Sequence, residues 1–149
     1  PTLESIPVAT ETAPVKQLVT IYVVALEDSG ISGKKIGCND SLVPIEVQTE
    51  SSLESPWNAV EALLSLSPTA LEASGLYTAF HQANLELVKY ETNNKTAQVY
   101  LEGELMIGGV CDHPRIEEQL YATILQSGQI EEVEIFINGE SLQDYLSLK

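Results

Sequence analysis

The residue types best suited to chemistry gather around two cysteines that lie far apart in the chain. Cys38 is followed closely by Asp40, and Cys111 is followed directly by Asp112 and His113. A lone distant pair of cysteines in a small acidic protein predicts one disulfide, which would stabilise the fold by about 4 kcal/mol and indicates an oxidising compartment. Two unpaired buried thiols in a cytosolic protein are the alternative.

A metal site is the second chemistry that these residues could support. If the two segments meet, the thiolates of Cys38 and Cys111, the imidazole of His113 and the carboxylates of Asp40 and Asp112 form a set of zinc ligands. Structural zinc sites usually draw their ligands in close local pairs of one ligand class, and the sequence has no such pair. The cysteines are also too far apart for the CxxC motif of thiol oxidoreductases. We therefore expect no metal and no cofactor.

The remaining candidate catalytic groups give no specific signal. His113 lies at a predicted helix start and His81 in an irregular segment, so capping or surface roles are expected for both. No G-x-S-x-G nucleophile motif occurs. Asp40 and Asp112 could serve as the acid pair of a glycan-cleaving enzyme, but a chain with 22 Asp and Glu always offers some pair at a suitable distance. We expect no enzyme activity and no catalytic residues, with cleavage of cell-wall glycan as the rival interpretation.

The charge balance excludes two large classes of partner. The chain has 22 Asp and Glu against 7 Lys and Arg, a formal net charge of -15. Such a chain repels phosphate backbones and anionic lipid surfaces, so we expect no nucleic acid partner. No stretch approaches the roughly 20 apolar residues that span a bilayer, so we expect no direct membrane insertion by this segment.

The elements that must position these residues are a mixture of strands and helices. Strands are predicted at 18–26, 43–47, 85–87, 97–101 and 133–137, and helices at 56–66, from 112 to just before Gly128, and at 141–148. The first strand is apolar on both faces, as in the centre of a sheet, whereas Pro44 places the second at a sheet edge or near a strand start. The turn at 92–95 predicts a hairpin.

This order predicts an α+β fold in a single two-layer domain, with an antiparallel or mixed sheet and helices packed on one face. Residues 1–16 have the composition of a flexible linker that tethers the domain, and residues 17–149 form the domain itself. Ser55 is the expected N-cap of the first helix.

Four segments carry a resemblance to a known family. They are the helix Trp57–Leu64, the end of the hairpin Ala97–Gly103, the helix Pro114–Leu120 and the closing strand Val133–Gly139. In this order they resemble the GerM domain, also called the sporulation and spore germination domain, over residues 17–147. The segments around the two cysteines are similar to a subgroup of that family with a paired cysteine.

The resemblance implies a non-catalytic domain of a bacterial envelope protein, either a lipoprotein or otherwise membrane-tethered, outside the cytoplasm. Its implied role is assembly with, or recruitment of, another envelope protein or a peptidoglycan-associated component, with self-association also open. A role in sporulation or germination follows from the family, although residues 67–77 depart from its common pattern. A purely structural spacer is a further alternative.

Four residues form the candidate interaction surface: Tyr77, Phe80, Arg115 and Phe136. The aromatic residues lie in the variable 67–83 segment and on the outward face of the last strand, where contacts with partners are expected. Arg115 lies in the first turn of a helix, which is unfavourable for a cation. It must therefore be held by a carboxylate such as Asp40 or Asp112, or by a partner.

Overall fold

The strands of this protein divide into two small sheets that face each other across a layer of helices. The computed structural model describes residues 17–49, 56–126 and 128–147. The first sheet is antiparallel, in the order β1-β3-β2, and consists of β1 (Gln17–Ala25), β2 (Lys34–Ile36) and β3 (Asp40–Thr49). The second has the order β4-β5-β6-β7 and consists of β4 (Asn84–Asn93), β5 (Thr96–Glu104), β6 (Glu132–Ile137) and β7 (Glu140–Ser141). The pair β5–β6 is parallel and its neighbours are antiparallel.

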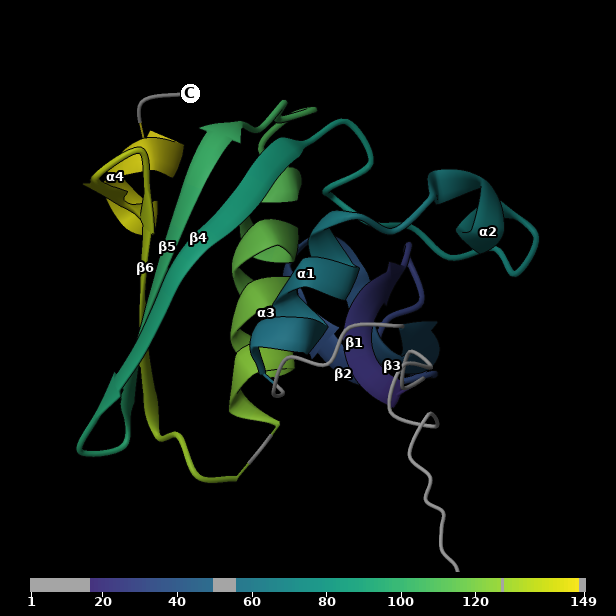
Figure 1. Cartoon of the computed structure of the whole chain (residues 1–149). Helices are drawn as coiled ribbons and strands as arrows, with labels where there is room; N and C mark the ends of the chain where they lie inside the picture. Colours follow the sequence, from purple (N-terminus) through teal and green to yellow (C-terminus); the bar gives the residue numbers. More distant parts are fainter. Residues whose placement is uncertain (1–16, 50–55, 127, 148–149) are drawn as a thin grey trace, which may run out of the picture.

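Two helices fill the space between the sheets. In Figure 1, α1 (Trp57–Leu64) and α3 (Asp112–Leu125) lie between β4–β6 on one side and β1–β3 on the other. The short helices α2 (Pro68–Glu72) and α4 (Leu142–Ser147) lie outside this layer, with α4 in contact with β6 and β7. The predicted α+β class with antiparallel and mixed pairing is confirmed. The sequence predicted two layers, one sheet with helices on one face. The structure has a second sheet on the other side of the helices.

The core follows the alternation of the strands and the stripe of the helices. On β5, Ala97, Val99 and Leu101 are buried, while on α3 the side chains of Ile116 and Leu120 are fully buried. Removing each large aliphatic side chain from water contributes roughly 1.5–3 kcal/mol. This burial fixes which face of α3 is turned toward each sheet.

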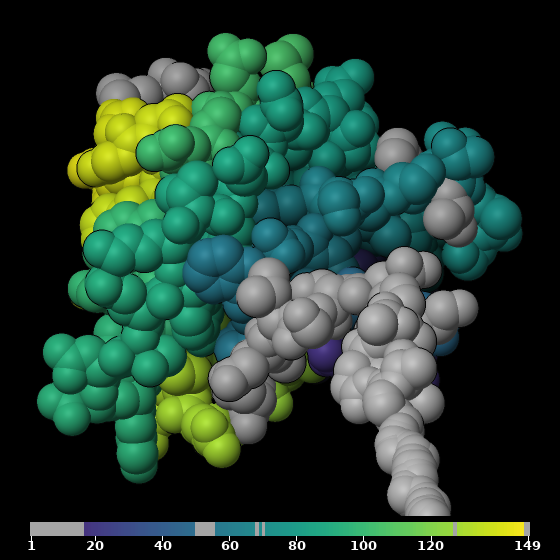
Figure 2. Space-filling view, in the orientation of Figure 1, coloured from purple at the N-terminus to yellow at the C-terminus, as the bar shows by residue number. Residues whose placement is uncertain are grey.

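The β4–β5 hairpin confirms the prediction from its turn residues. Asn94 and Lys95 connect the strands with φ angles of 52° and 72°, in the left-handed region that asparagine tolerates. The hairpin tip projects beyond the helices in Figure 1 and protrudes at the lower left of Figure 2. The helix α3, the strand β6, the turn at Asn138–Gly139 and α4 also lie where the sequence places them.

The prediction that the first strand is central is wrong, because β1 is the outer strand of its sheet. Polar side chains of α3 cover the open edge of β1 in place of another strand. Gln119 Nε2 donates to the carbonyl of Tyr22 at 2.9 Å, and the N–H of Tyr22 donates to Thr123 Oγ1 at 3.1 Å. Gln126 Nε2 donates to the carbonyl of Thr20 at 2.5 Å. The helix thus satisfies backbone groups that a further strand would otherwise pair, and the sheet can end at β1.

The prediction that the second strand lies at a sheet edge is also wrong. β3 is the middle strand of its sheet, although it contains Pro44. Its pairing with β2 is confined to Asp40–Leu42, so Pro44 lies past the end of β2. Tyr22, opposite Pro44 on β1, directs its N–H and carbonyl toward α3. The missing N–H of Pro44 therefore interrupts no pairing with β1.

Some predictions fall on residues outside those described, namely the linker at 1–16 and the N-cap Ser55. Among the described residues, no helix is long and apolar enough to cross a membrane.

The buried amide of Gln119 provides a test of this architecture. Replacing it by leucine (Gln119→Leu) leaves the N–H of Ala79 and the carbonyl of Tyr22 without their partner. We expect a loss of about 3 kcal/mol in the free energy of unfolding, since each unsatisfied buried group costs about 1–3 kcal/mol. Urea unfolding measures it. The control is Gln98→Leu, which removes an exposed hydrogen bond to Glu134 and should change stability by less than about 0.5 kcal/mol. Equal losses in both variants would contradict the role given to Gln119.

Candidate functional site

The disulfide joins two loops at one end of α3. Cys38, in the 3-10 turn Gly37–Asn39 between β2 and β3, is bonded to Cys111, which directly precedes α3. The structure therefore contains the pairing predicted from the sequence. Both Cys38 and Asn39 have positive φ angles, 61° and 63°. A backbone held in this region by two non-glycine residues requires support from its surroundings, which the covalent link provides.

Close packing at Gly37 brings this turn onto the first turn of α3. A Cβ atom at Gly37 would lie 2.9 Å from Cγ of Pro114. The glycine is therefore needed for the contact, because any side chain would push the turn away from the helix.

The two acids next to the cysteines converge on a single arginine. Arg115 Nε donates to Asp40 Oδ2 at 2.6 Å, and Arg115 Nη1 donates to Asp112 Oδ1 at 3.0 Å. The side chains of the two acids are almost fully buried, and that of Arg115 is 16% exposed. Burial alone would lower the pKa of Arg115, but the hydrogen bonds to Asp40 and Asp112 outweigh it and raise the pKa.

Tyr77 completes this cluster. Its hydroxyl donates to Asp112 Oδ1 at 2.9 Å, and the guanidinium carbon of Arg115 lies 5.1 Å from the centre of its ring. Burial and the hydrogen bond to Asp112 raise the pKa of Tyr77 to about 12. The backbone of Tyr77 also pairs with Val24, through two hydrogen bonds of 2.8 Å. The cluster thus links β1, β3 and α3.

Every carboxylate oxygen of the acid pair is already occupied by a donor. Asp40 Oδ1 accepts from the N–H of Glu27 at 2.9 Å, and Asp112 Oδ2 accepts from the N–H of Gly108 at 2.8 Å. The other two oxygens accept from Arg115. General acid–base catalysis needs a carboxyl group within reach of a substrate proton. These acids instead neutralise a buried cation and hold two loops.

The ligand set considered for zinc is not assembled. Two of its members, Cys38 and Cys111, are joined as a disulfide and offer no thiolate. In the described part of the chain, no group of three or more His, Cys, Asp and Glu residues is placed to hold a metal ion.

The structure corrects one of the four candidate surface residues, Phe80, and shows which of the two predicted alternatives applies to Arg115. Phe80 belongs to the hydrophobic core and is 3% exposed. The N–H of its neighbour Ala79 donates to the buried Gln119, which draws this segment inward. Arg115 is held by Asp40 and Asp112, so the carboxylate pairing considered for it is the one found.

The other two candidates are half-buried. Tyr77 donates its hydroxyl to Asp112 within the cluster. Phe136 stacks on Tyr100 of the neighbouring strand, with ring centres 5.1 Å apart and planes 14° apart. Sequence reasoning missed Tyr100, because the parallel register of β5 and β6 that makes it the partner of Phe136 is not visible in the local pattern.

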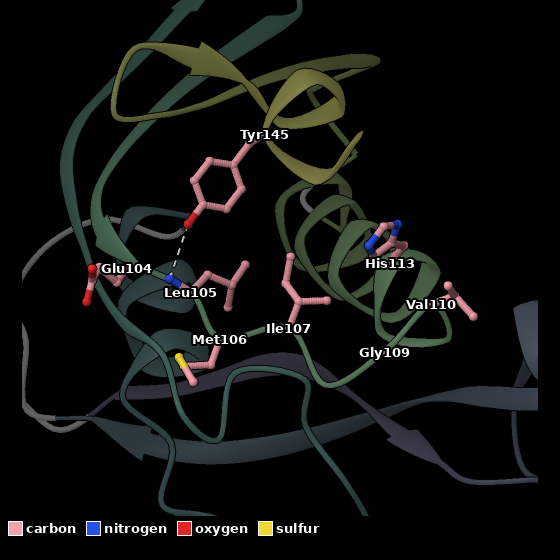
Figure 3. A pocket seen from close by; sticks show the side chains of 8 residues that line it. All are labelled: Glu104, Leu105, Met106, Ile107, Gly109, Val110, His113 and Tyr145. Atoms are coloured by element: carbon pink, nitrogen blue, oxygen red, sulfur yellow. Dashed lines mark hydrogen bonds between the residues drawn. The ribbon is translucent and has the colours of Figure 1, made fainter. Parts of the chain in front are cut away.

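A hollow of about 460 Å³ lies along the connection between β5 and α3. Figure 3 shows Tyr145 pointing from α4 toward Leu105, whose N–H donates to the tyrosine oxygen at 3.4 Å. His113 lines the same hollow, together with exposed apolar side chains such as Met106. The hollow brings together no nucleophile with a base.

The pairing of Arg115 with two buried acids can be tested by mutation. Arg115→Met leaves two buried carboxylates without a counter-charge, which should cost about 3–5 kcal/mol in the free energy of unfolding. Adding Asp40→Asn and Asp112→Asn to that variant should restore part of the loss. Lys34→Met is the control, since Lys34 is 69% exposed in its ion pair with Glu118 and should change stability by less than about 0.5 kcal/mol. Similar losses for Arg115→Met and Lys34→Met in thermal and urea unfolding would refute this role.

The contribution of the disulfide can be measured by reduction. Treating the protein with a reductant should lower the free energy of unfolding by about 4 kcal/mol, because the open chain gains conformational entropy when it unfolds. A variant with both Cys38→Ser and Cys111→Ser should show the lower stability without reductant and no further change with it. Free thiols in the untreated protein, or identical unfolding curves with and without reductant, would rule out the predicted contribution.

Comparisons with known proteins agree with this fold. The family described as Germane, sporulation and spore germination, matches residues 20–143. The solved tandem GerMN domains of the sporulation protein GerM from Bacillus subtilis are similar to this chain, with a TM-score of 0.60 and 18% sequence identity. That similarity covers 93% of this chain and 44% of the solved chain, so this chain spans less than half of its length. A comparison with curated proteins finds no match. The family match covers most of the sequence and confirms the resemblance, and the chain belongs to the Germane family of sporulation and spore germination domains.

Proposed function

We propose that this domain is a non-catalytic recognition module that joins or recruits another component of the bacterial envelope, outside the cytoplasm. The observation that carries this proposal is the stacked pair Tyr100–Phe136 on the outer face of the second sheet. Lys89 lies over the ring of Tyr100 at 5.5 Å and forms an ion pair with Glu91. An aromatic pair surrounded by charged side chains is the usual composition of a protein–protein interface.

The compartment and the tether are part of the same proposal. A disulfide persists in oxidising surroundings, such as the space outside the bacterial cytoplasm. The linker composition of residues 1–16 suits attachment to a lipoprotein anchor or another membrane tether. Family membership favours a process connected with sporulation or germination.

The rival wall-glycan enzyme has less support from the geometry. Its candidate acids, Asp40 and Asp112, are buried and saturated with hydrogen bonds from Arg115 and from backbone N–H groups. A catalytic acid pair would need space for a sugar between the two carboxyl groups.

Crosslinking in the native envelope, followed by mass spectrometry, tests the recognition proposal. We expect one recurrent protein partner, whose crosslinks are lost in the double variant Tyr100→Ser, Phe136→Ser. Leu18→Ser is the control, since Leu18 is 66% exposed on the other sheet and its substitution should leave the partner bound. Thermal unfolding establishes that both variants remain folded. A partner that stays bound to the double variant would argue against this surface. The absence of any partner would favour a spacer, and release of glycan from purified cell walls would favour the enzyme.

A further inference from the structure

A continuous groove runs along one face of α3 between the two sheets. Two adjoining hollows, of about 610 and 480 Å³, share the residues Lys34, Glu118, Tyr121 and Leu125. The edge of β6 forms one wall, and the segment of β2 and β3 around Leu42 forms the other. The floor is α3, which lies between these strands in Figure 1. The groove does not overlap the cluster of Asp40, Asp112 and Arg115, because none of those residues lines it.

The wall formed by β6 carries backbone groups that no strand pairs within the described part of the chain. Among the described residues, β6 has a strand partner on this edge only at Phe136 and Ile137. The N–H of Asn138 donates to Leu101 of β5, and backbone direction alternates along a strand. The N–H and carbonyl groups of Val133 and Ile135 are therefore directed away from β5, toward the groove side. They offer hydrogen bonds to an added strand.

Two other edge strands, β1 and β4, are less open to an added strand. Side chains of α3 cover β1, as described above. On β4, the register shifts between Leu87 and Lys89, a bulge that prevents regular pairing with a further strand. β6 has no bulge in its register with β5. β6 is therefore better suited than β1 or β4 to accept another strand.

Charge around the groove indicates what kind of segment would bind. Lys34 is already paired with Glu118 at 3.3 Å. Glu132 and Glu134 accept hydrogen bonds from the neutral side chains of Thr96 and Gln98, and neither is in an ion pair in the described part of the chain. Two copies of this chain pairing through β6 would bring these carboxylates together, which is unfavourable. A basic segment would be attracted.

From these features we infer that the groove binds an extended basic segment of a partner protein, which adds as a strand to the free edge of β6. Its alternate apolar side chains lie on Tyr121 and Leu125, and its Lys or Arg side chains meet Glu132 and Glu134. The free part of this edge ends at Ile135, because β7 pairs with β6 at Phe136 and Ile137. The inference rests on the proposed recognition function and adds the partner's chemistry and binding mode.

The test uses the full 149-residue chain and a blocked heptapeptide that alternates lysine and valine. Binding is followed by NMR, through amide hydrogen exchange and chemical shifts. We expect exchange at the N–H groups of Val133 and Ile135 to slow at least about tenfold at saturation, with shifts at Tyr121 and Leu125. A peptide that alternates glutamate and valine should produce neither effect.

Two N-methylated peptides distinguish strand addition from simple charge attraction. One carries the methyl groups on its valines and the other on its lysines. Since neighbouring N–H groups of a strand point to opposite edges, only one of the two peptides should lose binding. Retention of binding by both, or loss by both, would overturn the inference.

Charge-reversal variants locate the site. In the double variant Glu132→Lys, Glu134→Lys, the lysine peptide should no longer bind and the glutamate peptide should. The matched control is Glu86→Lys, Glu102→Lys, an exposed pair opposite each other on β4 and β5. An equal loss in the control would mean unspecific attraction and would overturn the inference.

The crosslinking experiment separates this inference from the recognition function. If a partner crosslinks in the envelope while the amides of β6 remain unprotected, strand addition in the groove is wrong and the recognition function stands. If no partner crosslinks and the amides remain unprotected, both proposals fail.

Discussion

The arrangement of this domain depends on the contact between the polar flank of α3 and the backbone edge of β1. A strand edge within a protein must find partners for its N–H and carbonyl groups, because an unsatisfied buried backbone group costs as much as a lost hydrogen bond. Gln119 is fully buried and bonds to Tyr22, Thr78 and Ala79 at once. One amide thereby fixes the helix, the strand and the connection before β4. With this edge closed by a helix, the sheet stops at β1.

A second set of contacts fixes the opposite end of the same helix. The disulfide and the pairing of Arg115 with Asp40 both tie the N-terminal turn of α3 to the beginning of β3. The cost of burying three charges is offset only because all of them are paired and hydrogen-bonded. The cluster takes two of the 22 acidic side chains and one of the 7 basic side chains away from the surface, which still leaves the outside of the protein strongly acidic.

The sequence predicts the features whose signal is local or repeats along one element. The hairpin follows from alternation and from Asn94 at the turn, and α3 follows from the apolar stripe that includes Ile116 and Leu120. Strand order could not be predicted, because the same apolar pattern suits a central strand and an edge strand covered by a helix. The polar residues Gln119, Thr123 and Gln126, which flank the stripe at helical spacing, were the one available sign of that cover. The sequence predicts Phe80 at the surface, whereas the structure buries it. Its burial depends on the hydrogen bond from its neighbour Ala79 to Gln119, which is distant in the sequence.

The acids that first suggest chemistry are therefore occupied within the fold, and the recognition that we propose would use the surfaces of the second sheet. Within that sheet β6 has a particular position: its inner face contributes Ile135 and Ile137 to the core, its outer face carries Phe136, and its free edge borders the groove. A strand bound there would rest on α3, which is held at both ends by covalent and buried polar contacts. Binding to such a fixed floor requires little ordering of the domain, so more of the contact energy would appear as affinity. The contacts that occupy the acid pair thus also hold α3 in place beneath the edge where we propose that a strand binds.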